Sequence, residues 1–164
     1  TKLVVEKPGA TGNSDADKLL RDGYRDLARI HEELGKIKNP AFAGPVRFLV
    51  ERGSAILRHV TEFPQKADSV RRFCSYYLPT TAKLLRAYAD LEAQTYEAGH
   101  IEETKADIEK TILDMPAAFD RQLDCLYRDV ALDISTDIVV LEQLLERDGL
   151  QDRQGAPGAS ETKE

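Results

Sequence analysis

The fold class is decided by the stretch IEETKADIEKTILDMPAAFDRQLDCLYRDVALDISTDIVVLEQLL, residues 101–145. Its apolar residues recur at a mean step of roughly 3.7 residues, close to the period of a straight α-helix. Pro116 or the Leu132–Ser135 stretch would interrupt it, and Gly149 is a natural C-terminal stop. The stretch therefore predicts one very long helix or two segments. Its apolar residues are Ile101, Ile108, Ile112, Met115, Phe119, Leu123, Leu126, Val130, Ile134, Ile138, Leu141 and Leu145.

Upstream, the same periodicity predicts three more helices. The first begins at Ser14, where Ser14 with Asp17 approximates an N-cap arrangement, and Asn39-Pro40 ends it. The second runs from about Pro45 to Glu62, and the third covers roughly residues 65–96. Pro79 lies inside the third, which predicts a kink or a one-turn break near Tyr77–Thr80.

The predicted architecture is all-α, an antiparallel bundle of four to five long amphipathic helices with a proline kink near Pro79. Residues 14–150 are expected to form a single helical bundle domain. Residues 1–13 are expected to be a flexible leader and residues 151–164 a disordered tail, because these segments are rich in Gly, Pro and polar side chains. The start TKLVVEKPG has no initiator Met, so we expect a longer native protein.

Composition narrows the class of partner. The net charge of −6 argues against a dedicated nucleic-acid binder and gives no attraction to an anionic membrane surface. No apolar run approaches the roughly 18 residues of a membrane span. Cys74 and Cys125 lie far apart among apolar neighbours, which favours two reduced core thiols in a cytoplasmic protein over a disulfide or a reactive thiol.

Three segments resemble the XpaC family, whose members are named bromo-chloroindolyl phosphate hydrolysis proteins. They are FCSYYLPTTAKLLRAYADLE (residues 73–92), IEETKADIEKTI (residues 101–112) and DVALDISTDIVVLEQLLERDGL (residues 129–150). The similarity covers roughly residues 40–150 and departs from the family pattern at Pro116 and at Val139-Val140. The resemblance implies hydrolysis of phosphomonoesters.

No catalytic signature accompanies that resemblance. A Cys-based phosphatase needs an Arg six positions after its Cys, where this chain has Thr80 and Ala131. The sequence Asp15-Ala16-Asp17 opens a helix, where acids favour the positive end of the dipole. His31, His59 and His100 are scattered and form no His-x-x-x-His pair. We assign no catalytic residue and predict no cofactor.

Two constellations remain as candidates. Asp129, Asp133 and Asp137 place three carboxylates on one helix edge, which is a solvated face, a salt-bridge seam or a weak candidate for a hard cation. The second constellation surrounds Pro79 and either binds an anion or a partner, or is structural, with Phe73 and Tyr77 in the core and the threonines bonding to the opened helix. Its members are Arg71, Arg72, Tyr76, Tyr77, Thr80, Thr81 and Lys83.

The predicted function is a non-enzymatic helical interaction module of a bacterial XpaC-like protein. The resemblance points to an envelope or toxic-anion stress response, and some relatives carry an N-terminal hydrophobic region that would tether a longer native protein to a membrane. The expected partner is another protein. The alternatives are a hydrolase acting on phosphomonoesters and an oligomeric scaffold.

Overall fold

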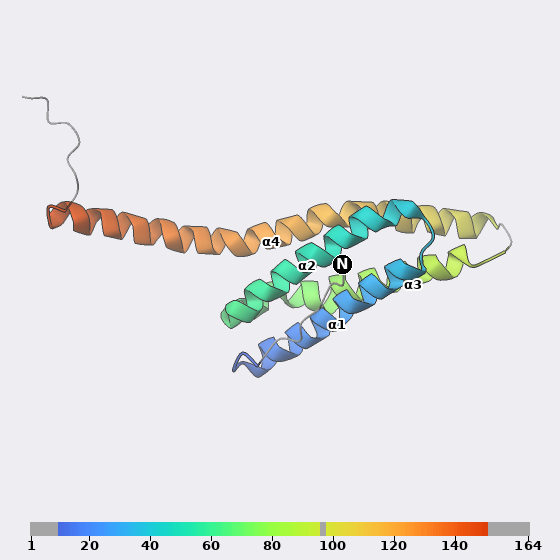
Figure 1. The fold of residues 1–164 in the computed structure, drawn as a ribbon, viewed down its shortest axis with the longest axis horizontal. Helices are drawn as coiled ribbons and strands as arrows, with labels where there is room; N and C mark the ends of the chain where they lie inside the picture. Colours follow the sequence, from blue (N-terminus) through green and yellow to red (C-terminus); the bar gives the residue numbers. More distant parts are fainter. Residues whose placement is uncertain (1–9, 96–97, 151–164) are drawn as a thin grey trace, which may run out of the picture. The chain divides into compact units, whose positions relative to one another are not determined.

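The computed structural model describes residues 10–95 and 98–150, and over these ranges it contains helices and no strand (Figure 1). The predicted all-α class is confirmed. The long helices are α1 (Ser14–Lys36), α2 (Ala43–Glu62), α3 (Leu78–Glu92) and α4 (Gly99–Arg147). Short helical turns precede two of these helices: η1 (Pro40–Phe42) lies before α2, and η2 (Pro64–Val70) and η3 (Phe73–Tyr77) lie before α3. The predicted tail, and the predicted leader up to residue 9, lie outside the described residues.

Helix α1 begins at Ser14 as predicted, but its cap is the preceding residue. The side-chain oxygen of Asn13 accepts the backbone N–H groups of Asp15 at 3.1 Å and Ala16 at 3.2 Å. These are amides of the first turn that have no partner inside the helix. The carboxylate of Asp17 accepts instead from Thr11. Ser14 was therefore the wrong cap, because Asn13 already occupies the position from which a side chain reaches these amides.

Helix α1 packs against both α2 and α3. Two glycines allow α1 and α2 to approach closely. A Cβ on Gly23 of α1 would lie 2.9 Å from Leu57, and a Cβ on Gly53 of α2 would lie 2.6 Å from Leu27. Both leucines are fully buried, so each glycine leaves room for a core side chain of the facing helix.

The segment before α3 is not a regular α-helix. It passes from the 3-10 turn η2 into the π-helical turn η3, in which the backbone N–H of Leu78 bonds to the carbonyl of Phe73. Pro79 lies in the first turn of α3 and has no N–H to donate. A wider π turn moves the preceding carbonyls away from the proline ring, which explains where the irregularity lies. The predicted third helix, residues 65–96, is thus three helical types in succession, ending at Glu92.

The chain divides into two compact units, residues 1–127 and 128–164. The single domain expected over residues 14–150 stays a prediction. In the first unit, α4 contributes Ile108, Ile112, Phe119 and Leu126 to the core.

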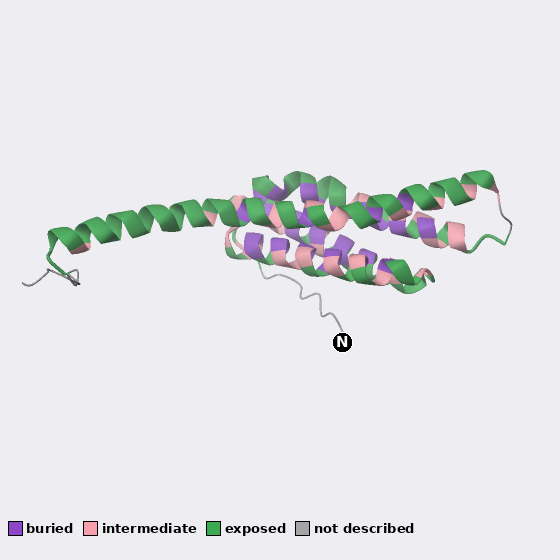
Figure 2. Cartoon of the chain, turned by 90° about the horizontal axis from the view of Figure 1, so that it is seen from above, coloured by how far each residue is buried: buried purple, intermediate pink, exposed green. Residues whose placement is uncertain are grey.

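In the second unit the described chain is helical to Arg147, and nearly all of its residues are exposed (Figure 2). Neither Pro116 nor Asp133 breaks α4, so the option of one long helix is confirmed. Gly149, at φ 68°, ends it as predicted, with the N–H of Leu150 bonded to the carbonyl of Leu145 at 2.8 Å. Within the described ranges, no helix combines the length and the apolar character that crossing a membrane requires.

Candidate functional site

The residues predicted around Pro79 have different surroundings. The Arg71 guanidinium bonds to the Asp68 carboxylate at 2.6 Å, and this hydrogen bond raises the arginine's pKa. Arg72 is exposed. Tyr76 is 62% exposed, and its ring meets that of Tyr77 edge-on with centroids 6.0 Å apart. Arg71 is therefore held by its own segment and does not face an anion recess.

The two threonines differ in burial. Thr81 is buried, and its hydroxyl donates to the carbonyl of Tyr77 at 2.6 Å. This bond supports the structural reading for Thr81, because it engages the hydroxyl with the last carbonyl of the π turn. Thr80 is half-buried. Tyr77, which that reading placed in the core, is 40% exposed.

Lys83 lines a charged groove between α1 and α3, with a volume of about 580 Å³. Both basic and acidic side chains line it, and Lys36 already pairs with Glu33 at 3.3 Å and with Glu32 at 3.8 Å. A mixture of this kind gives no strong preference for an anion or a cation. The lining residues are Arg29, Glu32, Glu33, Lys36, Pro79, Ala82, Lys83, Arg86 and Asp90.

Tyr77 lines a different recess, of about 270 Å³, which we call the aromatic recess. The buried rings of Phe73 and Phe119 form its floor, edge-on with centroids 4.9 Å apart. The sequence did not indicate that residues of α4 line this recess. The apolar stripe contained Met115 and Phe119, but their contact with the π turn is tertiary. The lining residues are Phe73, Tyr77, Met115, Ala118, Phe119, Arg121, Gln122 and Cys125.

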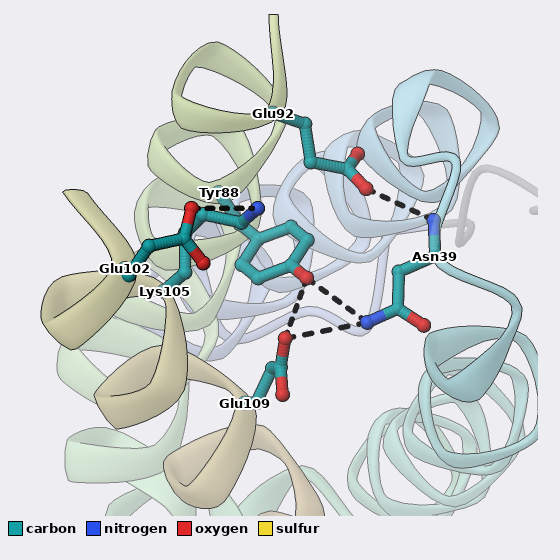
Figure 3. Close-up of polar contacts among 6 residues, drawn as sticks. All are labelled: Asn39, Tyr88, Glu92, Glu102, Lys105 and Glu109. Carbon is teal, nitrogen blue, oxygen red and sulfur yellow. Dashed lines mark hydrogen bonds and ion pairs between the residues drawn. The ribbon is translucent and has the colours of Figure 1, made fainter. Parts of the chain in front are cut away.

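A polar cluster, the Tyr88 cluster, joins three segments of the first unit (Figure 3). The buried Tyr88 hydroxyl donates to Glu109 at 2.6 Å and accepts from the Asn39 side chain at 2.9 Å. Glu92 accepts the backbone N–H groups of Lys38 and Asn39. Burial, with Glu109 as a further cause, raises the pKa of Tyr88 to about 12. The cluster ties α3 and α4 to the turn after α1, which is a structural role.

The two cysteines do not share one environment, and both are free thiols. Cys74 is buried as predicted, and burial raises its pKa to about 12. Cys125 is exposed at the rim of the aromatic recess, so its prediction as a core thiol was wrong. The apolar residues next to Cys125 in sequence lie on other sides of the helix, and those sides face the core. The periodic pattern alone does not show which side of the helix is buried.

Residues 10–95 and 98–150 contain no group of three or more His, Cys, Asp or Glu side chains arranged to hold a metal ion. Asp129, Asp133 and Asp137 lie along exposed helix in the second unit. His31 and His100 are exposed. His59 is buried, with its ring 5.0 Å from the rings of both Phe63 and Tyr127.

The second unit carries the largest set of apolar side chains that reach solvent. We call five of them the C-terminal apolar face: Val130, Ile134, Ile138, Leu141 and Leu145. Ile134, Ile138 and Leu141 are each about half exposed, and Val130 and Leu145 are partly exposed. At about 100° per residue these positions fall on one side of α4. Monomeric soluble proteins rarely leave such a continuous apolar surface uncovered.

Two comparisons returned nothing, since no curated protein and no solved structure matches the chain. A family model described as "5-bromo-4-chloroindolyl phosphate hydrolysis protein" matches residues 3–141. The match begins well before residue 40, where the sequence resemblance was expected to begin, and ends within the C-terminal apolar face.

Proposed function

The chain belongs to the 5-bromo-4-chloroindolyl phosphate hydrolysis protein family, also called the XpaC family, and we propose that it acts there as a non-enzymatic helical interaction module. The first unit supplies a stable core, and the second presents the C-terminal apolar face to another protein. The setting in this proposal is a bacterial envelope or toxic-anion stress response.

The observation that carries the proposal is the exposure of the C-terminal apolar face. Burying a Leu or Ile side chain contributes about 1.5–3 kcal/mol relative to leaving it in water. Ile134, Ile138 and Leu141 are about half exposed and forgo about half of that contribution within the described chain. An amphipathic helix gains it by laying its apolar side against a partner.

Site-specific cross-linking in cells of the source organism tests this proposal. A photoreactive residue at Ile138 is expected to trap another protein in one discrete adduct. The matched control places the same residue at Val140, which is equally exposed at 49% and lies about 160° around the helix. Adducts of equal yield from both positions, or none from Ile138, would contradict the proposal.

Hydrolysis of phosphomonoesters is the second candidate, and the description of the family supports it. In the first unit, Arg121 and Gln122 line the aromatic recess beside Tyr77, a combination that suits an aromatic ester with an anionic group. The test is turnover of an indolyl phosphate by the purified chain with several divalent metals, compared with the Arg121→Ala, Arg72→Ala and Tyr76→Phe variants. If the chain turns over the substrate and these substitutions abolish the turnover, the hydrolase takes the place of the interaction module as the proposed function.

A further inference from the structure

The flanks of the C-terminal apolar face are acidic on both sides. At about 100° per residue, Asp133 and Asp137 border one edge of the face, with the exposed Leu144 between them, and Glu142 and Glu146 border the other. Residues 128–150 hold six carboxylate side chains and two arginines, a net charge of −4. Of the two arginines, Arg128 lies at the start of the segment and Arg147 on the side opposite the face.

We infer that the partner surface is a basic amphipathic helix, with an apolar stripe flanked by Lys or Arg, and this inference rests on the proposed function. Apolar side chains on the partner would cover Ile134, Ile138 and Leu141, while its basic flanks would meet the carboxylates on either side. Residues 128–147 extend over about 30 Å, enough to pair with about three heptads of a partner helix.

Charge argues against a second copy of this chain as the occupant. With Ile138 and Leu145 at a positions and Ile134 and Leu141 at d positions, Asp137 falls at g and Glu142 at e. In a parallel self-pair, Asp137 of one helix would face Glu142 of the other. In an antiparallel self-pair, e faces e and g faces g, so the registers that align Asp137 with Asp137 or Glu142 with Glu142 bring carboxylates together. Like charges across such an interface are repulsive.

The same charge argues against an anionic membrane surface. Amphipathic helices that lie on such membranes carry Lys and Arg beside the apolar face. Residues 128–150 contain no Lys, and the borders of the face are mainly acidic. A basic protein helix is therefore the occupant that both the apolar and the charged features of the segment favour.

Titration of the full chain with two labelled peptides tests the inference. Both peptides have about three heptads with Ile or Leu at a and d, and they differ in carrying Lys or Glu at e and g. The Lys peptide is expected to bind at least about tenfold more tightly than the Glu peptide, with an affinity that falls as salt rises. Equal binding of both peptides would overturn the inference.

Two matched pairs of variants test whether the Lys peptide binds at the C-terminal apolar face. Ile138→Ser is expected to weaken Lys-peptide binding about tenfold or more, whereas Val140→Ser leaves it unchanged. The double variant Asp133→Lys with Asp137→Lys is expected to shift preference toward the Glu peptide. Glu103→Lys with Asp107→Lys makes the same charge change on an exposed part of the first unit and is expected to keep the preference. Equal effects within either pair would overturn the inference.

Alternative occupants give distinct results. If sedimentation shows a dimer that the Ile138→Ser variant no longer forms, the occupant of the face is a second copy of this chain. If the chain binds phosphatidylserine vesicles and does not bind the Lys peptide, the occupant is a membrane. Either result overturns the inference. If the Lys peptide fails to bind while the Ile138 cross-link to another protein persists, only the basic-helix inference falls. If both fail, the proposed function falls as well.

Discussion

At the scale of single residues, burial separates two thiols of otherwise equal chemistry. Cys74 is buried within the π turn, and its pKa is raised to about 12, so almost no thiolate exists near neutral pH. Cys125 is exposed at the aromatic recess. We expect a maleimide to modify Cys125 in the folded chain within minutes and Cys74 only after denaturant is added.

Mass spectrometry of the intact and the digested chain checks this expectation. The Cys125→Ser variant is the control and should take up no label while folded. Labelling of Cys74 at the rate of Cys125 would show that the core around the π turn opens far more readily than the packing indicates.

Tyr88 gives stability a dependence on alkaline pH. Its pKa is about 12 in the folded chain, against about 10 for an unperturbed tyrosine. Between these values the unfolded chain loses the proton while the folded chain keeps it, which favours unfolding. The stabilising contribution is therefore fully present below pH 10 and is lost as pH rises toward 12.

Tyr88→Phe is expected to lower the free energy of unfolding near pH 7 by about 1–2 kcal/mol, because the bonds to Asn39 and Glu109 are lost. It should also make the decline between pH 10 and 12 shallower, as urea unfolding at several pH values would show. Equal slopes for the two proteins would exclude Tyr88 as a source of the decline.

At the scale of the elements, two prolines occupy different helical environments. Pro116 lies in the interior of α4, where its ring removes one backbone hydrogen bond and crowds the preceding turn. Pro79 lies in the first turn of α3, after a π turn that accommodates it. Pro116→Ala is expected to raise the free energy of unfolding by about 1–3 kcal/mol, and Pro79→Ala is expected to change it by less.

Thermal and urea unfolding followed by circular dichroism would measure both variants. A larger gain from Pro79→Ala than from Pro116→Ala would contradict this assignment of the two prolines. It would indicate that strain resides in the π turn and not in α4.

The elements also show what the sequence predicts well and what it does not. Local signals set the start of α1 at Ser14 and the end of α4 before Gly149, because caps and left-handed glycines act within a few residues. The π turn and the contact of Gly53 with Leu27 depend on neighbours that are distant in sequence. Glycine is unfavourable inside a helix, and the structure shows that Gly53 of α2 leaves room for the Leu27 side chain of α1.

At the scale of the whole molecule, one periodic pattern produces two different surfaces. Ile108, Ile112 and Phe119 are buried, whereas Ile134 and Ile138 are about half exposed, although all five continue the same helical stripe. The sequence predicts that one face of α4 is apolar. Whether another element covers that face depends on tertiary packing, so periodicity could not identify the C-terminal apolar face as a candidate binding surface.

Hydrogen exchange in the purified, monomeric chain tests most directly whether the C-terminal apolar face is uncovered. Amides of residues 130–145 lie in a helix whose side chains are nearly all exposed, and they should exchange much faster than those of residues 108–119, whose stripe is in the core. Fast exchange at residues 130–145 with strong protection at residues 108–119 is the predicted result. Equal protection of the two segments would mean that the face is already covered within the chain, and would contradict its role as a binding surface.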